Sequence, residues 1–193
     1  MFQNLLERIG RAFRQSQIPY MVIGGQAVLV YGEPRLTKDI DITLGLGIEG
    51  LAKIINLVKK LNLKPLVSNI ETFVKETMVL PVIHEKSGIR VDLIFSHSPY
   101  ERQAIIRAKT IKLGRTEIQF AALEDVIIHK MIAGRARDIE DIRTILLKNS
   151  KYDSQYISKW LAEFDSALGK ELGKSFRAIK NGLSKKAGIM FRF

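Results

Sequence analysis

Two aspartates separated by a single isoleucine, Asp39 and Asp41, lie in the segment TKDIDITLG, where polar and apolar residues alternate. This period-two pattern predicts a β-strand over residues 38–44, so the two carboxylates share one face, about 6.6 Å apart along the strand. Like charges beside an apolar sheet repel each other unless a proton, a basic side chain or a cation compensates them. A divalent cation does this efficiently, although the pair could also decorate the solvated face of an edge strand.

A third aspartate, Asp92, belongs to the apolar run RVDLIF, which predicts another strand over residues 89–95. If this strand pairs beside residues 38–44, three carboxylates meet on one face of the sheet. Oxygen donors of this kind bind Mg²⁺ or Mn²⁺, which keep water and substrate phosphates as further ligands in phosphoryl transfer. The sequence therefore indicates a metal site formed by Asp39, Asp41 and Asp92.

Two glycines, Gly24 and Gly25, stand thirteen residues before the aspartate pair and directly after the apolar run 20–23. The run predicts a buried strand, and residues 26–31 predict a short helix that Gly32 ends. Backbone N–H groups of glycines at the start of a helix can approach phosphate oxygens closely. The glycines could also form only a tight turn, but the acids that follow favour a phosphate-binding loop.

Lys130 interrupts the apolar face of a helix predicted over residues 122–133, between Val126 and Ile127 on a helical projection. Such a lysine can bury its aliphatic stem and extend its ammonium group to water. In a chain with a predicted phosphate loop and three acids, we expect it to bind a nucleotide phosphate instead.

A break at Gly134 separates this helix from another one, predicted over residues 138–148. Asp138 and Asp141 near its start could cap the helix as an N-terminal pair, or could take part in binding or catalysis. Arg135 and Arg137 beside the break could contact phosphate or be solvated.

The elements that position these residues follow from the hydrophobic periodicity of the chain. Helices are predicted over residues 3–16, 26–31, 48–61, 122–133, 138–148, 153–168 and 171–181. Strands are predicted over residues 20–23 and 38–44, and as hairpins over 78–84 with 89–95 and within 110–120. This order predicts an α/β (α+β) fold, with a small mixed sheet flanked by helices over residues 1–121 and a helical C-terminal region over 122–193.

The composition narrows the class of protein. The 193 residues include no cysteine, which excludes disulfides and thiolate metal sites. No apolar run approaches the roughly 20 residues that span a bilayer, so we expect a soluble, cytoplasmic protein without a membrane partner. The net charge is +11, and residues 169–193 hold seven basic residues and one acid. This basic tail could bind RNA or another polyanion, or could simply be solvated.

The segments GG at residues 24–25 and RLTKDIDI at residues 35–42 together resemble the signature of the DNA polymerase β-like nucleotidyltransferase superfamily. In that signature an apolar residue and two small residues precede a D-x-D between apolar residues. Two later segments, VDLIFSHSPYERQAIIRA and ALEDVIIHKMIAGRARDIEDI, are similar to the branch of AbiEii-type toxin nucleotidyltransferases. The resemblance covers about residues 18–147 and implies a nucleotidyltransferase fold.

The resemblance implies a role for each residue that matches the superfamily signature. Gly24 and Gly25 match the phosphate-facing loop, and Asp39 and Asp41 match the metal-binding pair. Asp92 matches the third acid, which is expected to act as a base or as a ligand of a second metal ion.

Further positions match motifs of the toxin branch. Arg35 and Thr37 match its R-x-T-x-D-x-D extension, Lys130 matches a downstream lysine, and Asp138 or Asp141 matches the acid after it. AbiEii-type toxins are usually longer, with a larger helical C-terminal region. This difference bears on a toxin role and on a tRNA-sized substrate more than on the nucleotidyl-transfer chemistry.

The function implied is that of a nucleotidyltransferase dependent on Mg²⁺ (or Mn²⁺), with a nucleoside triphosphate (NTP) as substrate. A nucleoside monophosphate would pass to an acceptor hydroxyl of an RNA end, a protein or a small molecule, with release of pyrophosphate. Two alternatives stay open. One is a nucleic-acid-binding or regulatory module on an inactive scaffold, and the other is the toxin of a toxin–antitoxin pair, silenced by a protein partner.

Overall fold

The computed structural model describes residues 1–190, and their side chains up to residue 183. The end of the predicted basic tail, residues 191–193, and the side chains of residues 184–190 lie outside this description. None of the helices within residues 1–190 combines the length and the apolar character that crossing a membrane requires.

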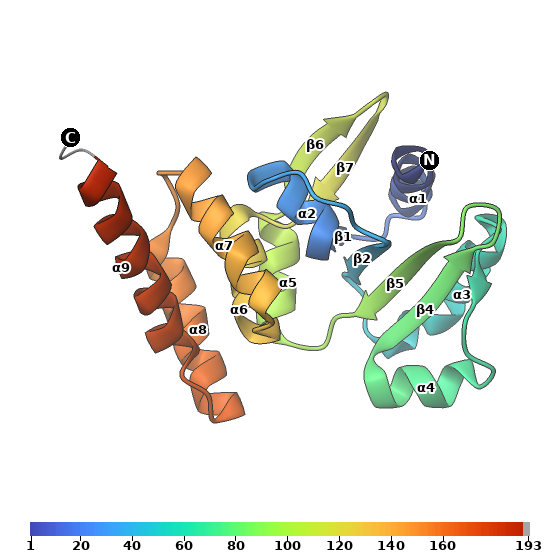
Figure 1. The fold of residues 1–193 in the computed structure, drawn as a ribbon. Coiled ribbons are helices and arrows are strands. Elements are labelled where there is room, and N and C mark those ends of the chain that lie inside the picture. The colour runs from blue at the N-terminus through green and yellow to red at the C-terminus, as the bar shows by residue number, and fades with distance from the viewer. Residues whose placement is uncertain (191–193) are drawn as a thin grey trace. The chain divides into compact units, whose positions relative to one another are not determined.

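Among the described residues, seven strands form one sheet in the order β3-β4-β5-β2-β1-β7-β6 (Figure 1). The strands are β1 (Tyr20–Ile23), β2 (Asp39–Leu44), β3 (Lys64–Pro65), β4 (Val79–His84), β5 (Ile89–Phe95), β6 (Lys109–Leu113) and β7 (Thr116–Phe120). Strand β2 lies in the centre, antiparallel to β1 and parallel to β5. The hairpins β4–β5 and β6–β7 form as the sequence predicts, so the sheet is mixed.

The helices before residue 123 are α1 (Phe2–Gln15), α2 (Gly24–Tyr31), the 3₁₀ turn η1 (Ile48–Gly50), α3 (Leu51–Lys60), α4 (Ile70–Thr77) and α5 (Pro99–Arg107). The later helices are α6 (Leu123–Ala133), α7 (Ala136–Lys148), α8 (Ser154–Leu168) and α9 (Leu172–Met190). The predicted α/β fold with a mixed sheet and a helical C-terminal region is therefore confirmed.

The chain divides into two compact units. We call Met1–Ala27 together with Leu36–Ala122 the α/β unit, and Val28–Arg35 together with the chain from Leu123 onward the helical unit. The division near residue 122 lies where the sequence suggests a change of organisation. The segment Val28–Arg35, however, belongs to the helical unit, although it precedes the central strand of the sheet.

Hydrogen bonds at the end of α7 account for the place of this segment in the helical unit. The side-chain amide of Asn149 donates to the carbonyl of Tyr31 at 2.8 Å, and the ammonium of Lys148 donates to the carbonyl of Gly32 at 3.1 Å. The last turn of α2 is thereby bound to α7, and its exposed carbonyl groups are satisfied by side chains.

In the α/β unit, α1 and α3 cover one face of the sheet. Ile9 and Phe13 of α1 and Ile54 of α3 line an apolar space together with Leu93 of β5. Because successive side chains of a strand point to opposite faces, Asp92 beside Leu93 must lie on the other face. The apolar half of each strand is thus buried by helices, and the aspartates are kept apart from it.

The helical unit has a core of its own. Ile127 of α6, Ile157 and Leu161 of α8, and Phe176 of α9 are all buried. Helices α8 and α9 run side by side, and α6 packs against both (Figure 1). This unit therefore does not depend on the sheet for its hydrophobic centre.

Hydrophobic periodicity does not predict α4 and α5, although α5 carries a start signal. Ser98 and Glu101 form a capping box, and Pro99 occupies the first helical position. Both helices are short, and the pattern of α5 is only weakly amphipathic, so a periodicity argument does not identify them. Two helices also have other bounds than predicted, since α7 begins at Ala136 and α9 continues to Met190.

Candidate active site

Parallel pairing of β2 with β5 brings the three predicted acids together on one face of the sheet. Asp41 lies opposite Asp92, and Asp39 lies opposite Arg90. Neighbouring strands are about 4.8 Å apart, so paired side chains are adjacent. The residues between the acids, such as Ile40, are fully buried, whereas the acids themselves are partly accessible. We call the face that carries Asp39, Asp41, Arg90 and Asp92 the acid face.

Arg90 is a residue of the acid face that the sequence analysis did not single out. Its Nε donates a hydrogen bond to Oδ1 of Asp92 at 3.0 Å. The two residues are two positions apart on one strand, so their side chains point to the same face, and this spacing could have identified Arg90. Arg90 supplies part of the positive charge that grouped carboxylates need.

The acid face fits a hard divalent cation by its chemistry, because Mg²⁺ and Mn²⁺ prefer oxygen ligands. Within the described residues, no group of three or more Asp, Glu, His or Cys side chains is arranged so that it could hold a metal ion. Asp92 binds Arg90 in this arrangement. An ion bound by all three acids would therefore share the Asp92 carboxylate with Arg90.

Gly24 joins β1 to α2 directly beside the acid face. Its φ of +64° lies in the left-handed region, which glycine adopts more readily than any other residue. A Cβ atom at this position would lie 1.9 Å from Oδ2 of Asp41. Glycine is thus required both by the backbone turn and by the carboxylate beside it, and Gly25 follows as a residue of α2.

Thr37 lies in the segment that leads from α2 into β2. Its hydroxyl accepts a hydrogen bond from the side-chain amide of Gln26, the residue that follows the two glycines. This bond joins the start of α2 to the chain just before Asp39. The sequence analysis predicted Thr37 as a site residue but did not single out Gln26.

In the helical unit, Lys130 is buried and paired with two carboxylates. Its ammonium group lies 2.6 Å from Oδ1 of Asp138 and 2.8 Å from Oδ2 of Asp141. Only 6% of the Lys130 side chain is accessible. The alternative that Lys130 extends its ammonium to water is therefore wrong, and the lysine interrupts the apolar face of α6 because two acids of α7 neutralise it.

Two arginines complete this group of charges. Arg35 binds Asp141 through two parallel hydrogen bonds, of 3.0 and 3.1 Å, and Arg135 Nε binds Asp138 at 2.7 Å. We call Arg35, Lys130, Arg135, Asp138 and Asp141 the charge cluster. It contains three cations and two carboxylates, so it carries one positive charge in excess.

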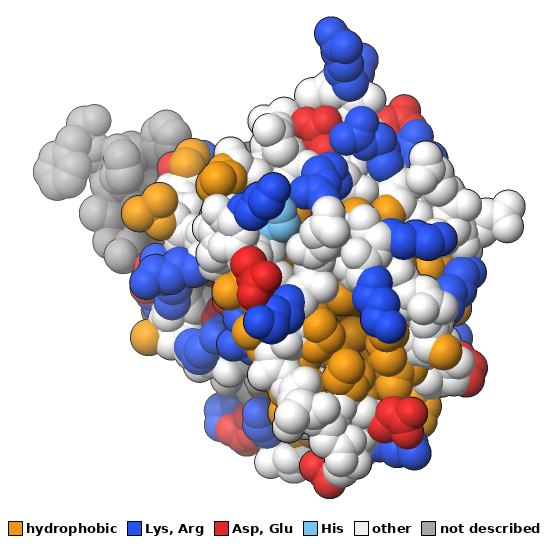
Figure 2. All heavy atoms as spheres, turned by 90° about the vertical axis from the view of Figure 1, so that its right-hand side faces the viewer, with side chains coloured by type: hydrophobic (Ala, Val, Ile, Leu, Met, Phe, Trp, Pro, Cys, Tyr) orange, Lys and Arg blue, Asp and Glu red, His pale blue; other side chains and the backbone are white. Residues whose placement is uncertain are grey.

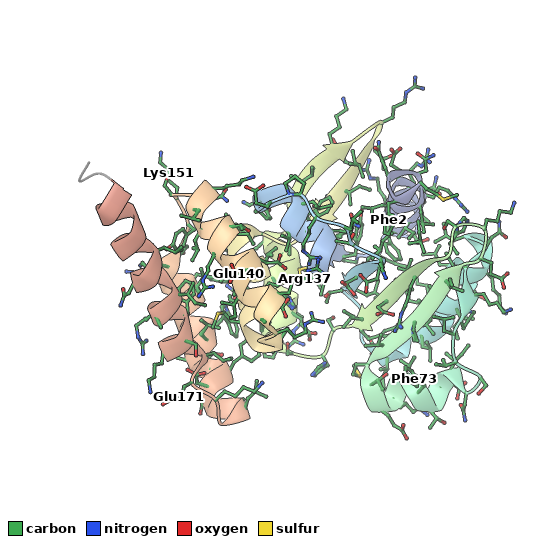
Figure 3. The ribbon with its side chains drawn as sticks, in the orientation of Figure 1. Phe2, Phe73, Arg137, Glu140, Lys151 and Glu171 are labelled. Carbon is green, nitrogen blue, oxygen red and sulfur yellow. The ribbon has the colours of Figure 1, made fainter. Side chains whose placement is uncertain are left out.

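The prediction that Asp138 and Asp141 form an N-terminal capping pair is correct only for Asp138. Because α7 begins at Ala136, Asp138 is its third residue and accepts a hydrogen bond from the backbone N–H of Arg135 at 3.2 Å. Asp141 lies one turn further along α7 and binds side chains instead. Arg137 is exposed on α7 near Glu140 (Figure 3).

The pKa of Asp138 is lowered from its ordinary value of 3.8. Burial by itself would raise this pKa, but the hydrogen bonds and charges of Arg135 and Lys130 outweigh it. The ionised carboxylate therefore stabilises the folded chain. This contribution is fully present above pH 3.8 and is lost as the pH falls through the lower pKa of the folded state.

We therefore expect the free energy of unfolding to fall in acid, and part of this fall to vanish in Asp138→Asn. Urea titrations between pH 5 and pH 2 can follow the unfolding by the fluorescence of Trp160, the only tryptophan, which is buried in the helical unit. Glu171→Gln, at an exposed carboxylate of the same unit, is the control. Equal pH slopes in Asp138→Asn and the native chain would contradict the assignment.

The predicted site residues thus belong to two groups. The α/β unit holds Gly24, Gly25, Thr37 and the three acids, and the pairing of β2 with β5 brings the acids together on the acid face. The helical unit holds Arg35, Lys130 and Asp138 in the charge cluster. Each group is internally connected by contacts that the sequence could not show.

The mixed sheet with its acid face and its helical C-terminal region has the fold of nucleotidyltransferases, as solved structures show. The antibiotic-resistance factor ANT(2'')-Ia, in complex with adenylyl-2''-tobramycin, has a TM-score of 0.59 at 16% identity, covering 86% of this chain and 98% of that chain. A nucleotidyltransferase-like antigen of Paracoccidioides brasiliensis has a TM-score of 0.55 at 15% identity, covering 86% and 87%.

A further structure of this fold is the lincosamide antibiotic adenylyltransferase LnuA with bound lincomycin. Its TM-score is 0.53 at 17% identity, covering 74% of this chain and 94% of that chain. The chain itself belongs to the family described as "Nucleotidyltransferase of unknown function (DUF6036)", whose model matches residues 2–180. No curated protein matches the chain.

Proposed function

We propose that the chain is a metal-dependent nucleotidyltransferase that transfers a nucleoside monophosphate from an NTP to an acceptor hydroxyl. The observation that carries this proposal is the pairing of Asp41 with Asp92 on adjacent strands, with Asp39 on the same face and Gly24 in contact with Asp41. Membership of a nucleotidyltransferase family supports the same chemistry.

In this proposal Asp39, Asp41 and Asp92 hold Mg²⁺ or Mn²⁺, which when bound neutralises phosphate charge and orients the reacting groups. Gly24 and Gly25 present backbone N–H groups at the start of α2 to the phosphates. The residues mainly position the substrates and balance charge, because phosphoryl transfer requires little covalent chemistry from the protein.

The acceptor hydroxyl oxygen forms a bond to the α-phosphorus of the NTP while the bond from that phosphorus to the pyrophosphate breaks. The hydroxyl proton passes to a carboxylate, for which Asp92 is the candidate because it matches the third acid of the superfamily signature, expected to act as a base or as a ligand of a second metal ion. Pyrophosphate leaves with the electrons of the broken bond.

For Lys130, Arg35 and Asp138, which match motifs of the toxin branch, nucleotide binding by the helical unit is a proposal that rests on that resemblance. The Lys130 ammonium is held by Asp138 and Asp141. Asp138 and Arg35 then act as positioning residues, since they hold Lys130 and Asp141. Thr37 would position the segment before Asp39 through its bond to Gln26.

The acceptor can be a small molecule, an RNA end or a protein. We favour small hydroxylated compounds as acceptors, because the similar structures include enzymes that adenylylate antibiotics. RNA is supported by the basic chain after residue 169 and by the Lys and Arg side chains spread over the face in Figure 2. Membership of the AbiEii-type toxin branch, with a silencing protein partner, stays a prediction.

The proposal is tested by incubating the protein with each α-labelled NTP, Mg²⁺ or Mn²⁺, and one acceptor class at a time. Total RNA, cellular protein and a metabolite extract are the three acceptor samples. Transfer of label to one class, with pyrophosphate in equal amount, is expected. Absence of label in every combination would refute the enzyme and leave the inactive binding scaffold.

Gly24→Ala is expected to reduce transfer about a hundredfold, the loss typical of a catalytic group displaced by about 1 Å. The new Cβ displaces the Asp41 carboxylate, which is the end of a flexible side chain, so the activity suffers more than the fold. The left-handed backbone adds about 1–2 kcal/mol of strain. Initial rates and urea unfolding measure the two effects separately.

Gly88→Ala is a matched control for Gly24→Ala. Gly88 has a φ of +66°, close to that of Gly24, but nothing lies within 4 Å of its Cβ position. It should therefore show the same backbone strain with full activity. Equal activity of the two variants would mean that the contact between Gly24 and Asp41 has no catalytic role.

A further inference from the structure

Arg90 lies on the acid face in a position to bind more than its present partner. About half of its side chain is accessible, 52%, compared with 20% for Asp92. Its Nε binds Asp92, while both terminal nitrogens have no protein partner among the side chains that the structure describes. Four of the five guanidinium N–H groups are therefore available to an anion from solution.

Arg90 and a divalent cation compete for the same carboxylate. Asp92 gives one oxygen to Arg90 at 3.0 Å, and an ion on the same carboxylate would lie close to the guanidinium, so the two positive charges weaken each other's binding. Arg90 also lies opposite Asp39, so its charge is near two of the three acids. The arginine thus stabilises the acid face in the absence of metal and weakens the attraction of that face for an ion alone.

We propose that Arg90 is a further substrate-binding residue, which holds Asp92 before the metal binds and contacts the phosphates of the NTP afterwards. When Asp92 turns to the ion, the guanidinium loses its partner and the triphosphate supplies a new one. The planar fork of arginine matches pairs of phosphate oxygens. This inference rests on the proposed function, because it needs both a metal and an NTP at the acid face.

The consequence is that metal and nucleotide bind cooperatively. The ion alone must displace Arg90 without compensation, whereas the ion and an NTP together give both Asp92 and Arg90 a partner. The coupling is reciprocal: bound metal increases the affinity for the nucleotide by a certain factor, and bound nucleotide increases the affinity for the metal by the same factor.

The test compares Arg90→Gln with the native protein in two titrations. Mn²⁺ alone is titrated and the free ion is measured by electron paramagnetic resonance. A non-hydrolysable NTP analogue is then titrated calorimetrically at saturating Mn²⁺. In the absence of nucleotide, we expect Arg90→Gln to bind Mn²⁺ about three- to tenfold more tightly than the native protein does. The effect is this small because the Arg90 side chain is half exposed, and water screens its charge. Arg90→Gln should bind the analogue about tenfold more weakly.

Two further variants separate the causes. Arg90→Lys keeps the charge but not the fork, so its affinity for Mn²⁺ alone should stay near the native value while its affinity for the analogue falls. Arg14→Gln removes an arginine of equal exposure that pairs with Glu117 elsewhere in the α/β unit, at 56% accessibility. It should change neither affinity.

An unchanged or weaker affinity of Arg90→Gln for Mn²⁺ would overturn the inference, and so would an unchanged affinity for the analogue. The proposed function fails in a different way. In that case the native protein and Asp39→Asn/Asp41→Asn would bind Mn²⁺ equally, with no difference that depends on the acids. Circular dichroism of Arg90→Gln checks that a loss of analogue binding does not come from unfolding.

Discussion

Asp41→Asn is expected to lower nucleotidyl transfer about a thousandfold or more, and the protein should still fold. Asp41 has the central place on the acid face, since it is paired with Asp92, two residues from Asp39, and in contact with Gly24. Asparagine keeps the shape of the side chain but removes the charge. Loss of one carboxylate from a metal site costs several kcal/mol of transition-state stabilisation, and each 1.36 kcal/mol is a factor of ten in rate.

The stability of this variant distinguishes a functional acid from a structural one. Three carboxylates on adjacent positions repel one another, and removal of one charge relieves part of this repulsion, so the variant should remain folded. Proteins commonly sacrifice stability in this way at functional sites. Rates of label transfer and urea unfolding are measured for the same protein sample.

Glu117→Gln is the matched control, because Glu117 is a strand carboxylate of the same unit that lies away from the acid face. It should retain full activity. If Asp41→Asn folds and transfers label as fast as Glu117→Gln does, Asp41 has no role in binding the metal.

The central part of the fold could be predicted because its signals are local. The alternation in DIDITL identifies β2, and the apolar spacing of α1 follows the helical period. The hairpins β4–β5 and β6–β7 have their turns between adjacent strands. Helices α4 and α5 depend on caps and on contacts with the sheet, which periodicity does not detect.

The acid face could be predicted only up to the register of its strands. Alternation places Asp39 and Asp41 on one face, but which residue of β5 lies beside Asp41 depends on a pairing between distant segments. A shift by one residue would place Leu93 there and Asp92 on the other face. Arg90 shares the face of Asp92 whatever the register, but its position opposite Asp39 depends on the same pairing.

For the charge cluster, the sequence indicates that Lys130 is unusual but does not reveal which residues it contacts. Lys130 was singled out because it interrupts an apolar stripe, but its partners lie on another helix, and Arg35 is 106 residues from Asp141 in the chain. Such pairs depend on how α6, α7 and the segment after α2 pack within the helical unit. No local pattern encodes that packing.

Lys130→Met is expected to lower the free energy of unfolding by about 3–5 kcal/mol, because it leaves two buried carboxylates without their shared cation. Methionine fills nearly the same volume, so the loss reports the charge rather than a cavity. Urea unfolding followed by Trp160 fluorescence measures it in the helical unit. Lys174→Met is the control, since the pair of Lys174 with Glu171 is 71% and 72% exposed and should contribute less than about 1 kcal/mol.

The double variant Lys130→Met/Asp138→Asn tests whether the partners act as one unit. Asp141 retains Arg35 after the loss of Lys130, whereas Asp138 retains only Arg135, whose side chain is mostly exposed. Removal of the charge at Asp138 should therefore recover part of the stability lost in Lys130→Met. The coupling energy of this double-mutant cycle should exceed about 1 kcal/mol. If the two substitutions change the free energy of unfolding additively, Asp138 and Lys130 do not act as one unit. Lys130 would then be neutralised mainly by Asp141, which Arg35 holds in place.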